Sequence, residues 1–416
     1  MNGAAPAPGA PAGPEPSRAL EAVLRGRAFA EPPEILAGIG DHDRAAHQIC
    51  ACRAIEAACQ ARIPEPVEAL RRLLCCAAWI EGHAARIHLV QAPGLLGCAD
   101  ADELARRHRA EMLRGLELRQ IGAELAEAVG GGVFGPPTVR IGGFRSVPTR
   151  VRLAVLRSRM DDALDAALET VRWISGFDFP QSVLDIPLLA LDDPERGPTA
   201  HGEARYPLDG GTGVLTTSGL GFPLADFESY ITRPRTGHPE SSRAMLRGAK
   251  AALTGPMARF ALTAPALNPA ARGAARAAGL DRAERNPYRT VLIRAVELVH
   301  ALEEACVLIE RYEPPDPPHV AVQPRAARGL AAVEAPSGLH YQRYDLLPSG
   351  RIGRARLIGA GELNRAAAEL DLRRAERTAR HREPAIGQDR LAELRAVLAN
   401  NYEPCVPGSF PAPAER

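Results

Sequence analysis

Apolar residues recur with the period of an α-helix over several long stretches of the chain. In one stretch, four side chains fall near a single helical face: Ile49, Cys52, Ile55 and Cys59. The stretch 67–91 is apolar on most sides, so we expect its helix to be central in the fold. Period, proline and glycine together predict helices over 18–30, 47–60, 67–91, 101–129, 149–175, 288–312 and 388–400.

Short strands are predicted between and after these helices. Residues 180–240 are rich in Gly, Pro, Thr and Asp and contain a strand-like piece at 213–217. Alternating residues in 320–358 predict strands at 320–322, 339–344 and 352–357. The pattern therefore predicts a mainly α (α+β) fold, with a core bundle of long helices and small peripheral β-sheets.

Proline and glycine mark the ends of elements and form no linker inside the chain. We therefore expect one domain over 18–416. The segment 1–17 is rich in Pro, Ala and Gly and is predicted to be a disordered tail.

Charge and composition exclude several function classes. The 416 residues are 46% hydrophobic, which is enough for a sizeable core. The 51 basic and 50 acidic residues give a net charge of +1, so no electrostatic footprint for nucleic acid or an anionic membrane is present. No apolar run reaches the ~18 residues that span a bilayer, and the start lacks the basic and apolar regions of a signal peptide. We expect a cytoplasmic protein without a membrane span.

The cysteines open the question of a metal. Residues two apart on a helix point about 200° apart and adjacent ones about 100° apart, so neither Cys50 with Cys52 nor Cys75 with Cys76 can chelate one ion. We interpret both pairs as small core residues, as we do Cys59, Cys98 and Cys306. One further thiol, Cys405, lies near the C-terminus.

Seven segments, in this order, resemble motifs of the large subunit of nickel–iron hydrogenases, closest to the soluble, cofactor-coupled group. They are RALEAVLRGR (18–27), HQICACRAIE (47–56), WIEGHA (79–84), RIGGF (140–144), NPYRTVLIRAVELVHALE (286–303), EAPSGLHY (334–341) and EPCVPG (403–408). Each segment alone is a weak signal, but seven in the family's order cover nearly the whole chain. The resemblance implies the large-subunit fold and a small-subunit partner that carries iron–sulfur clusters.

The resemblance also shows what is missing. In the family, four thiolates from two C-x-x-C motifs hold nickel, and two of them bridge to iron. The matching positions here are Gly40 and Asp43 in the first motif, with His47 as its histidine, and Cys405 and Gly408 in the second. Three of the four thiols are therefore absent, and the arginine expected over the iron is Ser337.

Several interpretations follow from this loss. We expect a degenerate homologue, a structural or electron-transferring subunit that does not activate dihydrogen and holds no nickel–iron centre. An active nickel-dependent hydrogenase is the alternative. A third possibility is a repurposed metal site in the vacated cavity, built from Asp43 and Cys405 with Asp41, His42 and His47.

Three other polar residues are interpreted as parts of the core. We expect Glu81 and His83 to form a polar pair within the long helix, and Glu334 to hold the turn before Pro336.

Overall fold

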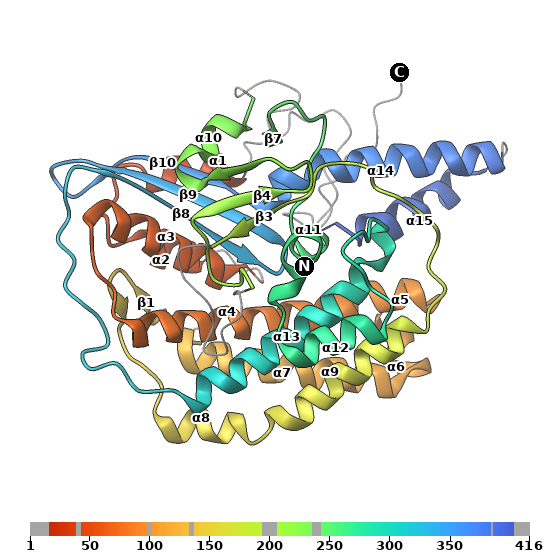
Figure 1. The fold of residues 1–416 in the computed structure, drawn as a ribbon, viewed down its shortest axis with the longest axis horizontal. Coiled ribbons are helices and arrows are strands. Elements are labelled where there is room, and N and C mark those ends of the chain that lie inside the picture. The colour runs from red at the N-terminus through yellow and green to blue at the C-terminus, as the bar shows by residue number, and fades with distance from the viewer. Residues whose placement is uncertain are drawn as a thin grey trace.

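A layer of long helices lies below a twisted antiparallel sheet (Figure 1). The structure is a computed structural model that describes residues 16–38, 43–98, 101–132, 137–193, 206–234, 243–383 and 386–402. The helices of these ranges are α1 (Pro16–Leu24), α2 (Pro32–Ala37), α3 (Arg44–Cys59), α4 (Glu65–Ala85), α5 (Ala92–Leu95), α6 (Ala101–Arg107), α7 (Arg109–Gly130), α8 (Arg150–Arg157), α9 (Met160–Ser175), α10 (Phe227–Tyr230), α11 (Pro256–Thr263), α12 (Pro269–Ala277), α13 (Thr290–Glu310), α14 (Ala360–Arg382) and α15 (Gln388–Ala399).

The helical layer is built around α4 and α13. The helix α4 packs against α7 and α13, and α13 packs against α9. Both central helices are apolar over most of their surface, so neighbours cover them on several sides. A π-helical segment, η1 (Arg86–Gln91), continues α4. Residues such as Trp79 and Leu292 are fully or almost fully buried in this layer.

The strands form four small antiparallel sheets. They are β1 (Val139–Arg140), β2 (Gly143–Phe144), β3 (Leu189–Asp192), β4 (Gly213–Thr216), β5 (Gly221–Pro223), β6 (Ile231–Thr232), β7 (Met245–Leu246), β8 (Arg328–Ala335), β9 (Gly338–Leu346) and β10 (Ile352–Ile358). The largest strands form a sheet of order β10-β9-β8, and the others form β3-β4-β5, β1-β2 and β6-β7. The helix α3 packs against β8 and β9 on one side and contacts α4 on the other, so it joins the sheet to the helical layer.

The predicted mainly α architecture with small sheets is confirmed, but several element boundaries differ. The helix predicted over 18–30 ends at Leu24, and the proline pair after it begins α2. Proline is compatible with a first helical turn because the N–H groups there need no helical partner. The predicted helices 101–129 and 149–175 are each interrupted once, near His108 and near Ser158. Residues Pro93 and Gly94, predicted to stop a helix, lie within the short α5.

One predicted strand was wrong, and one long helix was not predicted. The piece 320–322 is no strand; it follows an isolated bridge between Gly143 and His319. The helix α14 was not predicted, because its sequence carries few large apolar residues and many charges.

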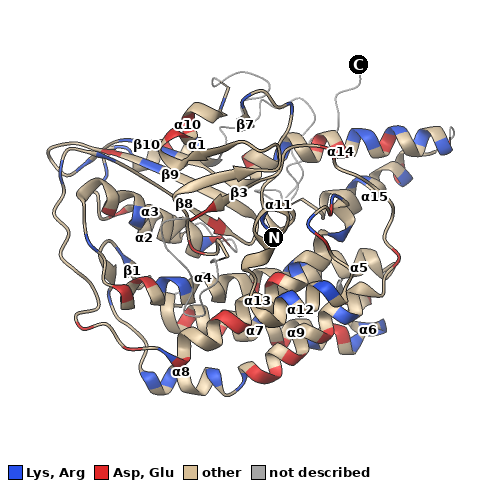
Figure 2. Ribbon diagram, in the orientation of Figure 1, with Lys and Arg blue, Asp and Glu red and all other residues tan. Residues whose placement is uncertain are grey.

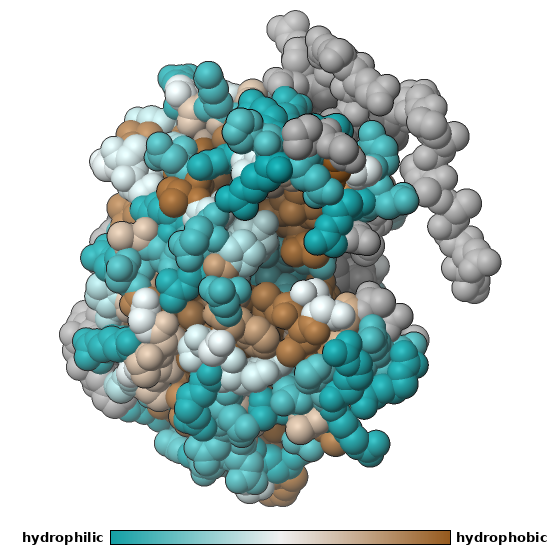
Figure 3. All heavy atoms as spheres, turned by 90° about the vertical axis from the view of Figure 1, so that its right-hand side faces the viewer, coloured by the Kyte–Doolittle hydropathy of each residue, from teal (hydrophilic) through white to brown (hydrophobic). Residues whose placement is uncertain are grey.

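Charges of both signs are interspersed over the helices (Figure 2), and the net charge is near zero. The face formed by α14, α15, α5 and α6 shows apolar side chains among hydrophilic ones (Figure 3). Leu370 of α14 and Val397 of α15 are among the exposed apolar residues, at 41% and 42%. In the described ranges, no helix combines the length and apolar character that crossing a bilayer requires.

Candidate functional site

Three of the residues singled out from the sequence meet in one place. The side chains of Asp43, His47 and Ser337 gather where the N-terminus of α3 meets the turn between β8 and β9. The other predicted positions, Gly40, Cys405 and Gly408, lie outside the described residues, as do Asp41 and His42.

The helix α3 positions Asp43 and His47. Asp43 is its N-cap residue, and the backbone N–H of His47 donates to the carbonyl of Asp43 at 2.9 Å, closing the first turn. A carboxylate at this end also complements the positive end of the helix dipole. The thiol of Cys50 donates to the carbonyl of Ala331 at 3.3 Å, which ties α3 to the sheet. The site is thereby fixed between two rigid elements.

A tight hairpin positions Ser337. The antiparallel register pairs Ala335 with Gly338, so only Pro336 and Ser337 form the turn. Gly338 has a φ of 137°, and a Cβ there would lie 2.9 Å from the backbone nitrogen of Gly255. Glycine is therefore required at this position.

The structure adds His340, which sequence reasoning missed. Strand β9 places it on the face that packs against α3, with 5% of its surface exposed. Its spacing from Ser337 by three residues is the available signal, since the strand alternation was predicted correctly over 339–344. That signal does not reveal that α3 brings Asp43 to the same point.

Hydrogen bonds converge on one carboxylate oxygen. The hydroxyl of Ser337 donates to Oδ2 of Asp43 at 2.5 Å, and Nε2 of His340 lies 3.0 Å from the same oxygen. The Ser337 hydroxyl and Nε2 of His340 are 3.2 Å apart. The rings of His47 and His340 meet edge to face, with centroids 4.6 Å apart. These four side chains, Asp43, His47, Ser337 and His340, are called the carboxylate cluster below.

The electrostatics keep Asp43 ionised. Burial raises the pKa of Asp43, but the charge and hydrogen bond of His340 and the Ser337 hydroxyl outweigh it, so its pKa lies well below the usual range. Burial and then the proximity of His340 lower the pKa of His47 to about 3. The cluster thus pairs an ionised carboxylate with a neutral His47 at physiological pH.

The cluster contains the residue types of a serine hydrolase but not the geometry. A nucleophile relay needs the imidazole between the hydroxyl and the carboxylate, with one ring nitrogen facing each. Here Nε2 of His340 faces both partners, and the Ser337 hydroxyl donates directly to Asp43. The arrangement holds the serine proton on the carboxylate side and does not activate Ser337 as a nucleophile.

A buried ionic network lies behind the hairpin. Arg259 bonds both carboxylate oxygens of Glu297, at 2.7 and 2.8 Å, and one oxygen of Glu334 at 2.8 Å. Its guanidinium also donates to the carbonyl of Ala335 and lies over the ring of Trp79, at 4.3 Å from the centroid. The network holds the start of the turn that carries Ser337.

The contacts of this network differ from two predictions about polar residues. Glu334 accepts from the backbone of Leu191 at 3.0 Å as well as from Arg259, so it does more than hold a turn. The expected pair of Glu81 and His83 was wrong: Nε2 of His83 lies 3.1 Å from Glu297, and Glu81 faces outward toward Arg119. The two residues are two positions apart on a helix and point in different directions.

Six of the seven described cysteines are buried in the core, as predicted, and Cys59 is half-buried against it. All are free, and six are buried: Cys50, Cys52, Cys75, Cys76, Cys98 and Cys306. Burial raises the pKa of Cys50 and of Cys52 far above the usual value, and that of Cys75 to about 12. These thiols therefore stay protonated, whereas a metal ligand must be a thiolate.

The chain is well anchored just before Cys405. The guanidinium of Arg86 donates to the carbonyls of Asn400 and Tyr402, at 3.0 and 2.9 Å. The hydroxyl of Tyr402 donates to Asp371 of α14 at 3.0 Å. The described chain thus ends, at Tyr402, against the helix η1 and α14.

This fold is that of the large subunit of nickel–iron hydrogenases. The chain superposes on an NAD+-reducing [NiFe]-hydrogenase with a TM-score of 0.81 at 20% identity, over 93% of this chain and 90% of the other. It superposes on the [NiFeSe]-hydrogenase of Dm. baculatum with a TM-score of 0.70 at 15% identity, over 93% and 91%.

Proteins similar to this chain in sequence are also hydrogenase subunits. The chain is 24% identical to the alpha subunit of sulfhydrogenase 1 from Pyrococcus furiosus, over 94% of this chain and 89% of that protein. It is 25% identical to the vhu A subunit of the F420-non-reducing hydrogenase from Methanocaldococcus jannaschii, over 82% and 86%. No family model matches the chain. The chain is a homologue of nickel–iron hydrogenase large subunits.

Among the described residues, Asp43 does not have the donor chemistry of the family's nickel ligands. The nickel–iron centre needs four thiolates, and the resemblance leaves sulfur only at Cys405. Asp43, which the resemblance places at one of these thiolate positions, is bonded to Ser337 and His340. Within the described ranges, no group of three His, Cys, Asp or Glu residues is arranged to hold a metal ion.

Proposed function

We propose that this chain is a structural or electron-transferring large subunit of a redox complex that does not activate dihydrogen. Its partner is expected to be a small-subunit-like protein with iron–sulfur clusters, and its compartment the cytoplasm. The observation that carries this proposal is the position of Asp43. The resemblance expects a nickel thiolate there, and the carboxylate of Asp43 is hydrogen-bonded to Ser337 and His340.

The chemistry of the donors supports this proposal. Carboxylate, imidazole and hydroxyl groups are harder ligands than thiolates and do not bridge nickel and iron as thiolates do. The replacement of the family arginine by Ser337 fits the same change, because its hydroxyl satisfies the carboxylate that replaced the thiol. The two substitutions therefore fit each other, because Asp43 and Ser337 form a hydrogen bond where the family is expected to hold its metals.

The direct test is dihydrogen-dependent reduction of a viologen dye by the complex purified from its host. We expect no reduction above that of buffer, and no difference between the natural chain and a Cys405→Ala variant. Dihydrogen-dependent reduction that the Cys405→Ala change abolishes would overturn the proposal.

An active nickel-dependent hydrogenase is the second candidate. It is favoured by the relatives, which are named as hydrogenase subunits and match nearly the whole chain. The neighbouring genes offer an inexpensive discriminator: genes for nickel and cyanide insertion favour the active enzyme, and a small-subunit gene without them favours our proposal.

A repurposed metal site is the third candidate, with Asp43 and Cys405 as its proposed ligands. It is favoured by Nδ1 of His47, which is buried and has no hydrogen-bond partner within the described ranges. Zinc, iron or manganese at one ion per chain, lost in an Asp43→Ala variant and in a Cys405→Ala variant, would identify this candidate.

A further inference from the structure

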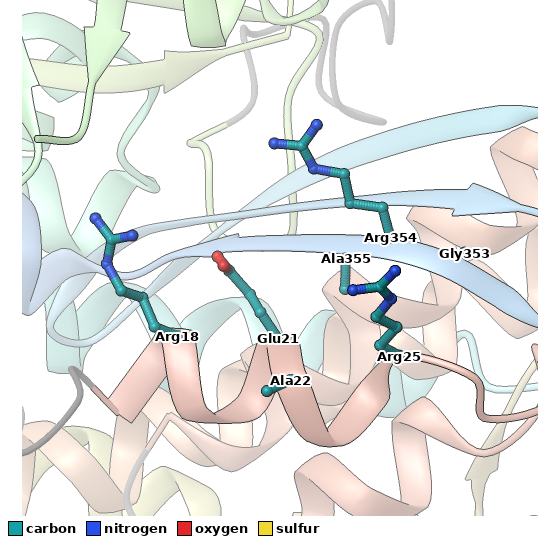
Figure 4. Close-up of a pocket in the computed structure, with 7 residues that line it drawn as sticks. All are labelled: Arg18, Glu21, Ala22, Arg25, Gly353, Arg354 and Ala355. Carbon is teal, nitrogen blue, oxygen red and sulfur yellow. The ribbon is translucent and has the colours of Figure 1, made fainter. Parts of the chain in front are cut away.

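A basic pocket lies between α1 and β10, the strand at one edge of the three-stranded sheet. Its volume is about 420 Å³, and its lining consists of Arg18, Glu21, Ala22, Arg25, Gly353, Arg354 and Ala355 (Figure 4). The lining contains three arginines and one glutamate and no large apolar side chain. A pocket of this size is typical of small-molecule sites, but those are mostly apolar.

Helix geometry explains why the arginines share one wall. Arg18 and Arg25 are seven residues apart, which is two helical turns, so they lie on the same side about 10 Å apart along the axis. Glu21 lies between them, and all three side chains rise from α1 and the turn directly after it toward the strand (Figure 4). Strand β10 contributes Arg354 opposite.

The one carboxylate of the pocket is already engaged. Glu21 accepts from the guanidinium of Arg233 at 2.7 Å and from the backbone N–H of Leu357 at 2.9 Å. Arg233 in turn pairs with the buried Glu362 at 2.7 Å. Glu21 therefore serves the packing of α1 on the sheet and is not available to neutralise the pocket arginines.

Two of the arginines are exposed and available. Arg25 and Arg354 make no hydrogen bond or ion pair with any residue in the described ranges, and both are exposed. Basic residues also recur along β9 and β10 beside α1 (Figure 2). A planar guanidinium presents paired donors that match the oxygens of phosphate and carboxylate groups.

We propose that this pocket binds a small multivalent oxyanion, one that carries at least two phosphate or carboxylate groups. Arg25 and Arg354 bind it directly, and Arg18 extends the positive wall toward a second anionic group. The proposal is independent of the function proposed above, because the pocket shares no residue with the carboxylate cluster.

Titration calorimetry of the full chain tests this, with tripolyphosphate and citrate as probes that separate the phosphate source from the carboxylate source. We expect saturable binding of at least one probe at one site per chain. The double variant R25A/R354A should weaken that binding by at least about tenfold, because it removes charged hydrogen-bond donors that we expect to contact the anion. Both side chains are exposed, so the unfolding midpoint should not change.

The matched control is Arg27→Ala. Arg27 lies two residues from Arg25 but outside the pocket, and it pairs with Glu31 at 3.5 Å. We expect this variant to bind within about twofold of the natural chain, because exposed pairs contribute little. Absence of binding by both probes, or a weakening in R27A equal to that in R25A/R354A, would overturn the proposal.

Discussion

At the residue scale, Asp43 decides how the site is interpreted. Its Oδ2 lies within hydrogen-bond distance of the Ser337 hydroxyl and of Nε2 of His340, so this oxygen is a well-satisfied acceptor. Burying a carboxylate is costly unless such partners are present, and here Ser337 and His340 supply them. The cluster thereby stabilises the junction between α3 and the β8–β9 hairpin.

Replacing Asp43 by alanine should therefore destabilise the fold. The change leaves the Ser337 hydroxyl and the His340 imidazole without their acceptor, which we expect to cost about 2 kcal/mol of unfolding free energy. Urea unfolding at pH 7.5 measures the effect. The control is D162A, because Asp162 is exposed on α9 and its removal should cost less than about 0.5 kcal/mol. Equal losses in the two variants would contradict a structural role for Asp43.

The order of motifs along the chain was enough to single out Asp43, His47 and Ser337. It could not identify His340, because that contact depends on how α3 docks against β9. It also paired His83 with the wrong glutamate, since the true partner, Glu297, lies on α13, more than two hundred residues away in sequence. Contacts between distant elements are not encoded in local spacing.

At the element scale, the buried helices were the most predictable. Helices α3 and α13 carry long apolar patterns and were predicted within a few residues of their ends, and the helix predicted over 67–91 covers α4 and η1. The helix α14 escaped prediction because alanines and charged residues dominate it, and its buried residues lie mostly in its first half. Patterns of large apolar residues do not reveal a helix that packs through alanine.

Close packing of α4 on α7 depends on glycine, which the sequence pattern also did not reveal. A Cβ at Gly122 would lie 2.5 Å from the backbone nitrogen of Glu81 in α4, so the two helices would have to move apart. We expect Gly122→Ala to destabilise the protein by about 2 kcal/mol. The measurement is the urea unfolding midpoint.

Gly273 in α12 is the matched control. No atom lies within 4 Å of a Cβ built there, and the residue is exposed. Gly273→Ala should therefore stabilise the protein by about 0.5–1 kcal/mol, since alanine restricts the unfolded chain more than glycine does. A Gly122→Ala variant that also gains stability would show that α4 and α7 pack less closely than described.

At the scale of the whole molecule, buried histidines should make stability depend on pH. Burial lowers the pKa of His88 to about 4 and that of His300 to about 4. In the unfolded chain the pKa is about 6.5, so between these values the unfolded state binds more protons and stability falls as the pH falls. Each histidine should account for about 2 kcal/mol lost between pH 7.5 and pH 5.

The variant His300→Gln isolates this effect. Unfolding free energies at pH 7.5 and pH 5 should differ by about 2 kcal/mol less in this variant than in the natural chain. His381→Asn, at an exposed position of α14, should leave the difference unchanged. A His300→Gln variant with the same pH dependence as the natural chain would mean that His300 titrates normally in the folded state.

The molecule as a whole retains the hydrogenase large-subunit fold over nearly its full length while its described site holds carboxylate, imidazole and hydroxyl groups. Our central claim is that the fold serves a redox complex without a nickel–iron centre. The most direct test is the nickel content of the complex purified from its host, measured by elemental analysis. We predict far less than one nickel per chain, both in the natural protein and in an Asp43→Ala variant. One nickel per chain, lost on Cys405→Ala substitution, would contradict the claim.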